Sequence, residues 1–170
     1  MKLLKYFGII FLFAFAVNGC KKEPTGFSPV TFKLKDAPAT YQEVNIEVIE
    51  VQIHCNNGGW TSLDVADSIY DLLLLQNNAT AVLGTLQVPV GTVSQVRLIL
   101  GSQNTVKINN VVYPLTLSSQ DESGLKLSIH QTLIANNPYT LVLDFDAMQS
   151  INDNGNGTYK LKPVMSASFN

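Results

Sequence analysis

Three aspartates near the C-terminal end carry the side chains best suited to hold a cation. Asp144 and Asp146 are two residues apart in a predicted strand, so they share one face, and Asp153 follows in the polar run 152–157. Calcium accepts six to eight oxygen ligands, and these carboxylates with loop carbonyls could supply them. Pro163 stands where a calcium loop has its closing acid. The alternative is a turn rich in residues that tolerate left-handed backbone. Apart from calcium, no cofactor is expected.

Arg97 and Trp60, each the sole residue of its type, are the best candidates for ligand contact. A guanidinium forks onto carboxylates, so Arg97 could hold an anionic ligand. We favour instead an ion pair with an acid on a neighbouring strand, such as Asp144 or Asp146. Trp60 could stack on a sugar ring with tyrosines that converge on it, or it could cap the core beside a turn. The candidate tyrosines are Tyr41, Tyr113, Tyr139 and Tyr159.

The motifs of common enzymes are missing from the sequence. It contains no Gly-x-Ser-x-Gly elbow, no phosphate-binding glycine loop and no His-Glu-x-x-His. His54-Cys55 resembles half of a metal site, but His130 is the only other histidine, and a zinc shell would lack ligands. We therefore expect a protein that is not an enzyme, with Cys55 at a strand end facing the core.

The N-terminal segment is typical of a bacterial lipoprotein signal. Lys2 and Lys5 precede an apolar run from Tyr6 to Val17, which is too short to cross a bilayer as a helix. The run ends in a relaxed lipobox, Val17-Asn18-Gly19-Cys20. We predict cleavage after residue 19, lipid on Cys20, and a polar tether over residues 20–29. The alternative is an ordinary secretory signal in which Cys20 is incidental.

Composition limits the partners of the mature chain. Loss of Lys2 and Lys5 with the signal would leave 9 of the 11 basic residues against 13 acidic ones. A net negative chain with one arginine argues against nucleic acid as a partner. The expected partners are a membrane, through lipid on Cys20, and a glycan or an envelope protein. Asp67-Ser68-Ile69 also fits the pattern at which some Gram-negative bacteria O-glycosylate exported proteins, so Ser68 is a candidate modification site.

Residues 30–170 have the pattern of a single all-β domain. Val30 to Lys35 alternates apolar and polar residues, and further short extended runs follow, separated by turn residues. The run from Ser68 to Leu75 is either a buried strand or a short helical turn, and Tyr159 to Phe169 is predicted as the last strand. No convincing amphipathic helix interrupts the series. This pattern predicts one antiparallel β-sandwich.

Two stretches predict finer detail. In the run from Val44 to Ile53, Val44, Ile46 and Val48 share one face, but Val51 and Ile53 have the other parity. This slip near Ile49-Glu50 implies a β-bulge or a change of packing partner. Asn109-Asn110 between two extended runs suits a type I′ hairpin, because asparagine tolerates positive φ.

Eight short motifs, spread over residues 30–167, resemble an uncharacterised lipoprotein family, domain of unknown function 4382. They are Asp36-Ala37-Pro38, Trp60, Tyr70-Asp71-Leu72-Leu73, Pro89-Val90-Gly91, Gln95-Val96-Arg97-Leu98, Gly124-Leu125-Lys126-Leu127, Leu143-Asp144-Phe145-Asp146 and Leu161-Lys162-Pro163-Val164. The Pro-x-Gly turn also looks like that of prealbumin (transthyretin-like) sandwiches, although Thr92-Val93 replaces the usual Thr-Tyr. The resemblance implies an envelope-attached β-sandwich and no catalytic residues.

Together these features predict an outer-membrane lipoprotein of a Gram-negative bacterium, facing the periplasm or the cell surface. The expected function is that of a non-catalytic interaction or adhesion module. The alternative is a carbohydrate-binding accessory lipoprotein. Aromatic side chains converging in a groove would favour the alternative, whereas an unpaired edge strand or a flat apolar patch would favour the first.

Overall fold

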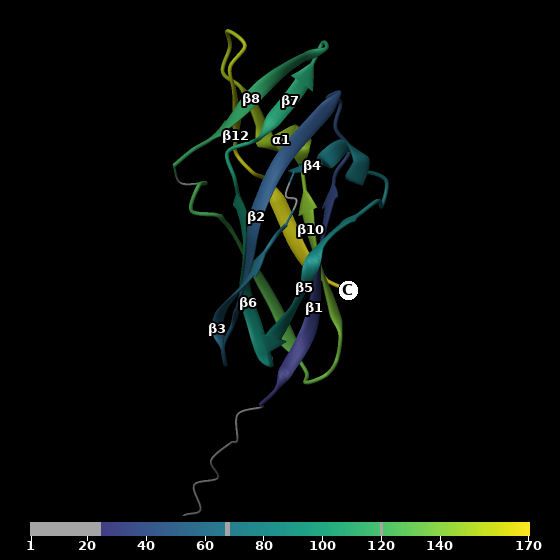
Figure 1. Ribbon diagram of the computed structural model, residues 1–170, viewed down its shortest axis with the longest axis vertical. Coiled ribbons are helices and arrows are strands. Elements are labelled where there is room, and N and C mark those ends of the chain that lie inside the picture. The colour runs from purple at the N-terminus through teal and green to yellow at the C-terminus, as the bar shows by residue number, and fades with distance from the viewer. Residues whose placement is uncertain (1–24, 67–68, 120) are drawn as a thin grey trace, which may run out of the picture.

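The computed structural model describes residues 25–66, 69–119 and 121–170, and these residues form two β-sheets around a shared core (Figure 1). The smaller sheet has four strands in the order β13-β10-β1-β5. Their bounds are β1 Phe27–Asp36, β5 Ala81–Pro89, β10 Tyr139–Phe145 and β13 Met165–Phe169. β1 begins at Phe27, inside the stretch predicted to be tether. It ends at Asp36, just before Ala37-Pro38, as the sequence predicts.

The larger sheet has nine strands in the order β11-β12-β8-β7-β2-β6-β9, with β3 and β4 also paired to β2. The bounds are β2 Glu43–Cys55, β3 Gly59–Asp64, β4 Ile69–Asp71, β6 Gly91–Leu100, β7 Thr105–Ile108, β8 Val111–Leu117, β9 Leu125–Leu133, β11 Ile151–Asp153 and β12 Tyr159–Leu161. The helices are single turns, η1 Leu72–Leu75 and α1 Ala147–Ser150. Among the described residues, no helix is long and apolar enough to cross a membrane.

β2 is the long strand that joins the two halves of the larger sheet. Its lower half, residues 48–55, pairs with β6 on one side and β3 on the other, while residues 43–47 pair with β7 and β4. The register shifts between Val48 and Glu50, where the buried parity changes. Both alternatives predicted from the slip in apolar residues are therefore confirmed. The strand bulges, and it changes partners there.

The core contains the inward side chains of both sheets. Alternate residues of β1 are buried, with Val30, Phe32 and Leu34 fully inaccessible to solvent. Ile46 and Ile53 of β2 belong to the same buried cluster. Cys55 is also fully buried, which confirms the prediction that it faces the core.

The prediction of a wholly antiparallel sandwich is wrong, because both sheets are mixed. β1 pairs in parallel with β10, and β12 pairs in parallel with β8. The predicted last strand is also two strands, β12 in the larger sheet and β13 in the smaller one. Pro163 lies in the break between them, and a proline has no N–H to donate to a ladder. The chain changes sheets at that point.

The predicted hairpin is confirmed. Asn109 and Asn110 have φ angles of 51° and 62°, as a type I′ turn requires, and they join β7 to β8. The uncertain run from Ser68 to Leu75 contains the short strand β4 followed by the helical turn η1. Its first residue, Ser68, lies outside the described residues.

Candidate functional site

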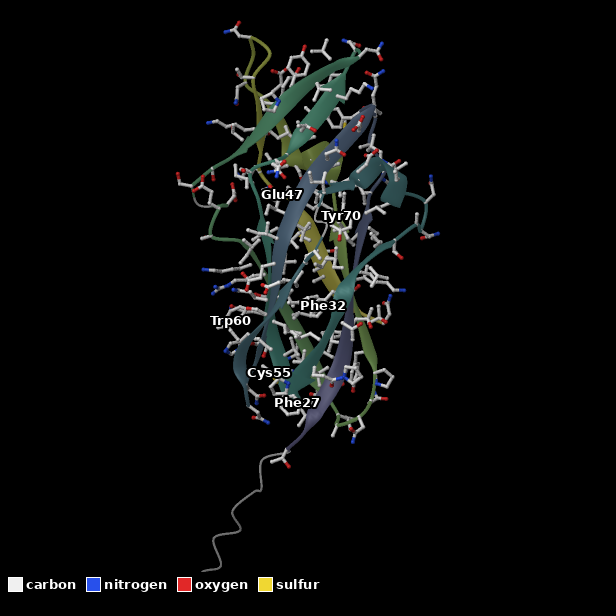
Figure 2. All side chains as sticks on the ribbon, in the orientation of Figure 1. Phe27, Phe32, Glu47, Cys55, Trp60 and Tyr70 are labelled. Carbon is white, nitrogen blue, oxygen red and sulfur yellow. The ribbon has the colours of Figure 1, made fainter. Side chains whose placement is uncertain are left out.

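Trp60 stands on an exposed face of the larger sheet, in the lower half of the view in Figure 2. The turn before it places it on β3 directly opposite His54 of β2, and His54 is in turn opposite Gln95 of β6. Trp60 is 38% exposed. The indole is therefore presented by paired strands rather than by a loop. We call Trp60, His54 and Arg97, with the outward polar residues beside them, the tryptophan face.

Arg97 and His54 hold the indole in place. The Arg97 Cζ atom lies 4.0 Å from the centroid of the Trp60 ring, a cation–π contact. The His54 ring meets the indole edge-on, with centroids 5.1 Å apart, and His54 Nδ1 is hydrogen-bonded to Ser94 Oγ at 2.9 Å. Arg97 and His54 thus both pack on the indole, and the 38% of Trp60 that stays exposed is the part that a ligand can contact.

The predicted ion pair of Arg97 is wrong. Asp144 pairs with Lys35 of the adjacent parallel strand, with Nζ and Oδ2 2.8 Å apart, and Asp146 caps helix α1. Both acids belong to the smaller sheet or its end, whereas Arg97 is in the larger sheet. Within the described ranges Arg97 has no ion pair, and its buried Nε has no hydrogen-bond partner. Its contact with Trp60 was not expected from the sequence, because the two residues are 37 positions apart.

Charges of both signs surround the tryptophan face. Gln52 lies between Ser62 and Arg97 across the strands, and Lys126 of β9 lies beyond Arg97. Hydrogen bonds from Ser62 and Gln52 lower the pKa of Glu50 below its usual range, so Glu50 is ionised at neutral pH. The face therefore offers an aromatic surface, hydrogen-bond donors and acceptors, and no single strong sign of charge.

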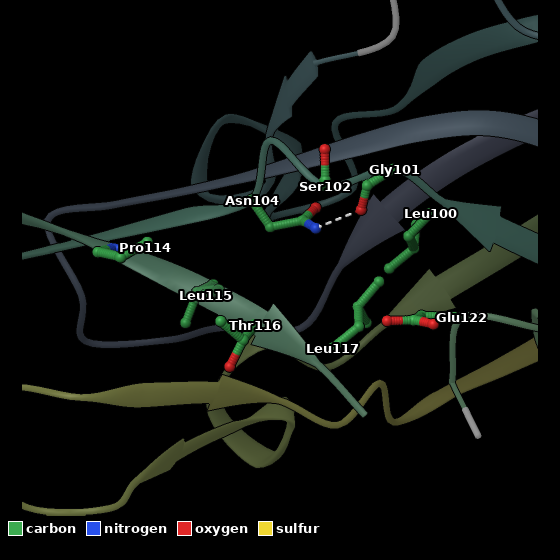
Figure 3. A pocket seen from close by; sticks show the side chains of 9 residues that line it. All are labelled: Leu100, Gly101, Ser102, Asn104, Pro114, Leu115, Thr116, Leu117 and Glu122. Atoms are coloured by element: carbon green, nitrogen blue, oxygen red, sulfur yellow. Dashed lines mark hydrogen bonds between the residues drawn. The ribbon is translucent and has the colours of Figure 1, made fainter. Parts of the chain in front are cut away.

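A cleft of about 430 Å³ opens elsewhere on the larger sheet (Figure 3). It is lined by Leu100, Gly101, Ser102, Asn104, Pro114, Leu115, Thr116, Leu117 and Glu122. The buried Asn104 shapes it, because its Nδ2 donates to the Gly101 carbonyl at 2.7 Å and its Oδ1 accepts from Glu47 N at 2.9 Å. The volume suits a small molecule, but Glu122 is the one ionisable group in the lining. The cleft shares no residue with the tryptophan face, and sequence reasoning did not find it.

The aromatic residues do not converge on Trp60. Tyr113 and Tyr159 pack together near the upper end with ring centroids 5.0 Å apart, while Tyr139 packs on Phe169 in the smaller sheet. Partial burial, the Asp153 charge and the neighbouring Tyr113 and Tyr41 raise the pKa of Tyr159 above its usual value. Tyr41, Tyr113 and Tyr159, which we call the upper tyrosines, thus form a group of their own, and Asp153 lies near Tyr41 and Tyr159.

The three candidate calcium ligands are each engaged in a separate local interaction. Asp144 pairs with Lys35, Asp146 Oδ1 accepts from Gln149 N at 2.9 Å, and Asp153 Oδ1 accepts from Gly155 N at 2.7 Å. In the part of the chain that the structure describes, no group of three or more His, Cys, Asp or Glu is arranged to hold a metal. Calcium binding stays a prediction.

Asp36 is a buried carboxylate that the sequence marked only as the end of a strand. It is 5% exposed, its Oδ1 accepts from Ala147 N at 2.9 Å, and its Oδ2 accepts from Gln76 Nε2 at 3.3 Å. These bonds join the end of β1 to α1 and to the residue after η1. Burial raises the pKa of Asp36 to about 6; the two hydrogen bonds oppose this, and Asp146 and Asp144 add to it. The group is structural, yet it titrates close to neutral pH.

Cys20 and Ser68, the predicted lipidation and glycosylation sites, lie outside the described residues. The described part defines a strand-rich domain of two mixed sheets, with a tryptophan and an arginine stacked on an exposed sheet face.

The chain belongs to the family described as domain of unknown function (DUF4382), whose model matches residues 27–163. The match confirms the family resemblance drawn from the motifs. No curated protein and no solved structure matched the chain. The likeness to prealbumin sandwiches therefore stays a prediction.

Proposed function

We propose that this protein is a lipid-anchored, non-catalytic interaction module of the Gram-negative outer membrane, and that it binds its partner through the tryptophan face. One observation carries the proposal: Trp60 is held by Arg97 and His54 on an exposed sheet face. Tryptophan and arginine are the residues most enriched at binding hot spots. An indole already fixed by its neighbours loses little side-chain freedom on binding.

The separation of the aromatic residues favours an interaction module over a dedicated carbohydrate site. A sugar-binding groove would gather several rings, but the upper tyrosines and Tyr139 lie apart from Trp60. β5 and β13 are the outer strands of the smaller sheet, and an outer strand can pair with a strand of another chain. Carbohydrate binding is the second candidate, because Trp60 is 38% exposed and an exposed indole can stack on a sugar ring.

Photo-crosslinking in intact cells tests the proposal. A benzoylphenylalanine placed at Ser62, on the same face as Trp60, should give a discrete adduct. The same group at Ser168, exposed on β13, should not. Trp60→Ala should weaken binding by about 30-fold or more, which corresponds to about 2 kcal/mol, and remove the adduct. Val112→Ala, at an exposed residue on β8, is the matched control.

Three outcomes would count against this function. Equal adducts from Ser62 and Ser168, or an adduct that survives Trp60→Ala, would exclude the tryptophan face as the binding surface. If glycan-array binding is found and is lost in Trp60→Ala while no protein adduct forms, the carbohydrate candidate replaces the interaction module.

A further inference from the structure

The lower end of the molecule is a compact cap built from four segments around the start of β1 (Figure 1). Gly26 O accepts from Val90 N at 3.0 Å, and Phe27 O accepts from Asn136 N at 3.0 Å. Ser28 Oγ also donates to the Asn137 carbonyl. These bonds tie the first strand to the junction of β5 and β6 and to the loop between β9 and β10. We call this end, comprising residues 26–29, 56–59, 87–92 and 131–138, the lower pole.

Two large apolar side chains project from the lower pole into solvent. Phe27 is 57% exposed and Ile134 is 64% exposed (Figure 2 labels Phe27). Their segments are joined by the bond between Phe27 O and Asn136 N, so the two side chains belong to one rigid surface. An aromatic and a branched aliphatic side chain exposed together are costly in water and favourable at a lipid interface.

The described segments that form this surface carry no charge. The four segments of the lower pole contain no Asp, Glu, Lys, Arg or His, and their polar groups are amides and hydroxyls such as those of Asn57 and Asn136. The opposite end of the molecule, formed by β7, β8, β11, β12 and the start of β2, differs, because its strands carry Glu43, Lys107, Asp153 and Lys160. Moving an ionised group toward hydrocarbon is expensive, so the lower pole can approach a bilayer at lower cost than the opposite end.

The chain leaves the domain at this pole, close to the proposed anchor. Cys20 and Phe27 are seven residues apart, and a fully extended chain spans at most 3.3–3.6 Å per residue, or about 25 Å in all. A lipid on Cys20 would therefore keep the pole within reach of the headgroups. Such tethering gives the lower pole a high effective concentration at the membrane, so that a small apolar contact is enough to hold the pole against the bilayer.

We propose that the lower pole rests against the lipid bilayer, with Phe27 and Ile134 inserted at the interface. The inference rests on the proposed anchor at Cys20. It adds an orientation to that anchor. With the lower pole against the bilayer, the long axis of the domain would point away from the membrane surface, and the tryptophan face would stay accessible on the side of the domain.

Depth-dependent quenching tests the proposal on the mature lipidated chain. Bimane is attached to Ile134→Cys, or to Val112→Cys as the control. Val112 is 59% exposed on β8, and the buried Cys55 should stay unlabelled. The protein is placed in phosphatidylethanolamine–phosphatidylglycerol vesicles with brominated acyl chains. The label at 134 should shift its emission to the blue and be quenched several-fold more than the label at 112. Adding Phe27→Ser should reduce that quenching while the protein still floats with the vesicles.

A flotation assay distinguishes failure of the membrane-facing pole from failure of the anchor at Cys20. A chain that floats with the vesicles but shows equal quenching at positions 134 and 112 overturns the membrane-facing pole and leaves the anchor intact. A chain that does not float overturns the anchor, and the orientation proposed here falls with it.

Discussion

Phe32→Ala is expected to lower the free energy of unfolding by about 3–5 kcal/mol. Phe32 lies in the middle of β1, is fully buried, and is among the largest side chains in the core. β1 has β10 on one side and β5 on the other, and Phe32 belongs to the core shared by the two sheets, so its loss would leave a cavity in that core. β1 is fixed by ladders on both of its edges, so it cannot move far enough to fill the space.

Phe27→Ala on the same strand provides the matched control. Phe27 is 57% exposed, and the same substitution there should change the free energy of unfolding by no more than about 0.5 kcal/mol. Urea denaturation of the mature protein, followed by circular dichroism, compares the two variants. Equal losses at positions 27 and 32 would contradict the core described for this fold.

Asp36→Asn is expected to make the protein up to about 3 kcal/mol more stable than wild type at pH 8. Burial raises the pKa of Asp36 from 3.8 in the unfolded chain to about 6, and each unit corresponds to about 1.4 kcal/mol. Because the folded state binds the carboxyl proton of Asp36 more tightly than the unfolded chain does, protonated Asp36 contributes its full stabilisation of the fold below pH 4. That contribution is lost as the pH rises through 6. Asparagine stays neutral, and its Oδ1 can still accept from Ala147 N.

The test is the difference in unfolding free energy between wild type and Asp36→Asn, measured from pH 4 to pH 8. Taking this difference removes the contributions of the other titrating groups, which the two proteins share. As the pH rises from 4 through 6, the unfolding free energy of the variant should increase relative to that of the wild type. Asp64→Asn, at an exposed carboxylate of β3, should show no comparable change. Parallel stability curves for wild type and Asp36→Asn would show that Asp36 does not titrate near pH 6 in the folded state.

Local patterns in the sequence predicted the local parts of the fold. The parity change in β2 and the paired asparagines of the β7–β8 hairpin each follow from interactions within a few residues of the chain. The parallel pairing of β1 with β10 joins segments about a hundred residues apart, and nothing in either strand specifies the partner. For the same reason, the division of the last predicted strand between two sheets was missed, although Pro163 marked the break.

The candidate site was predictable to the same extent. Trp60 and Arg97 were identified by residue type, but their stacking depends on which strands lie on either side of β2. The partner proposed for Arg97 was wrong because strand order could not be derived from pattern alone. Asp36 was missed because its burial is created by α1 and the residue after η1, which close over it from distant parts of the chain.

The cellular fraction in which the chain is found tests the proposed envelope anchor most directly. The wild-type protein and a Cys55→Ala control, which changes the other cysteine, should be recovered with the outer membrane. Cys20→Ser should lose its lipid and be released from the membrane fraction, with a folded domain of unchanged circular dichroism. Intact mass of the wild-type protein should fit a chain that begins at Cys20 and carries acyl groups. A Cys20→Ser variant that stays in the membrane, or a mature wild-type chain without lipid at residue 20, would contradict anchorage through this cysteine.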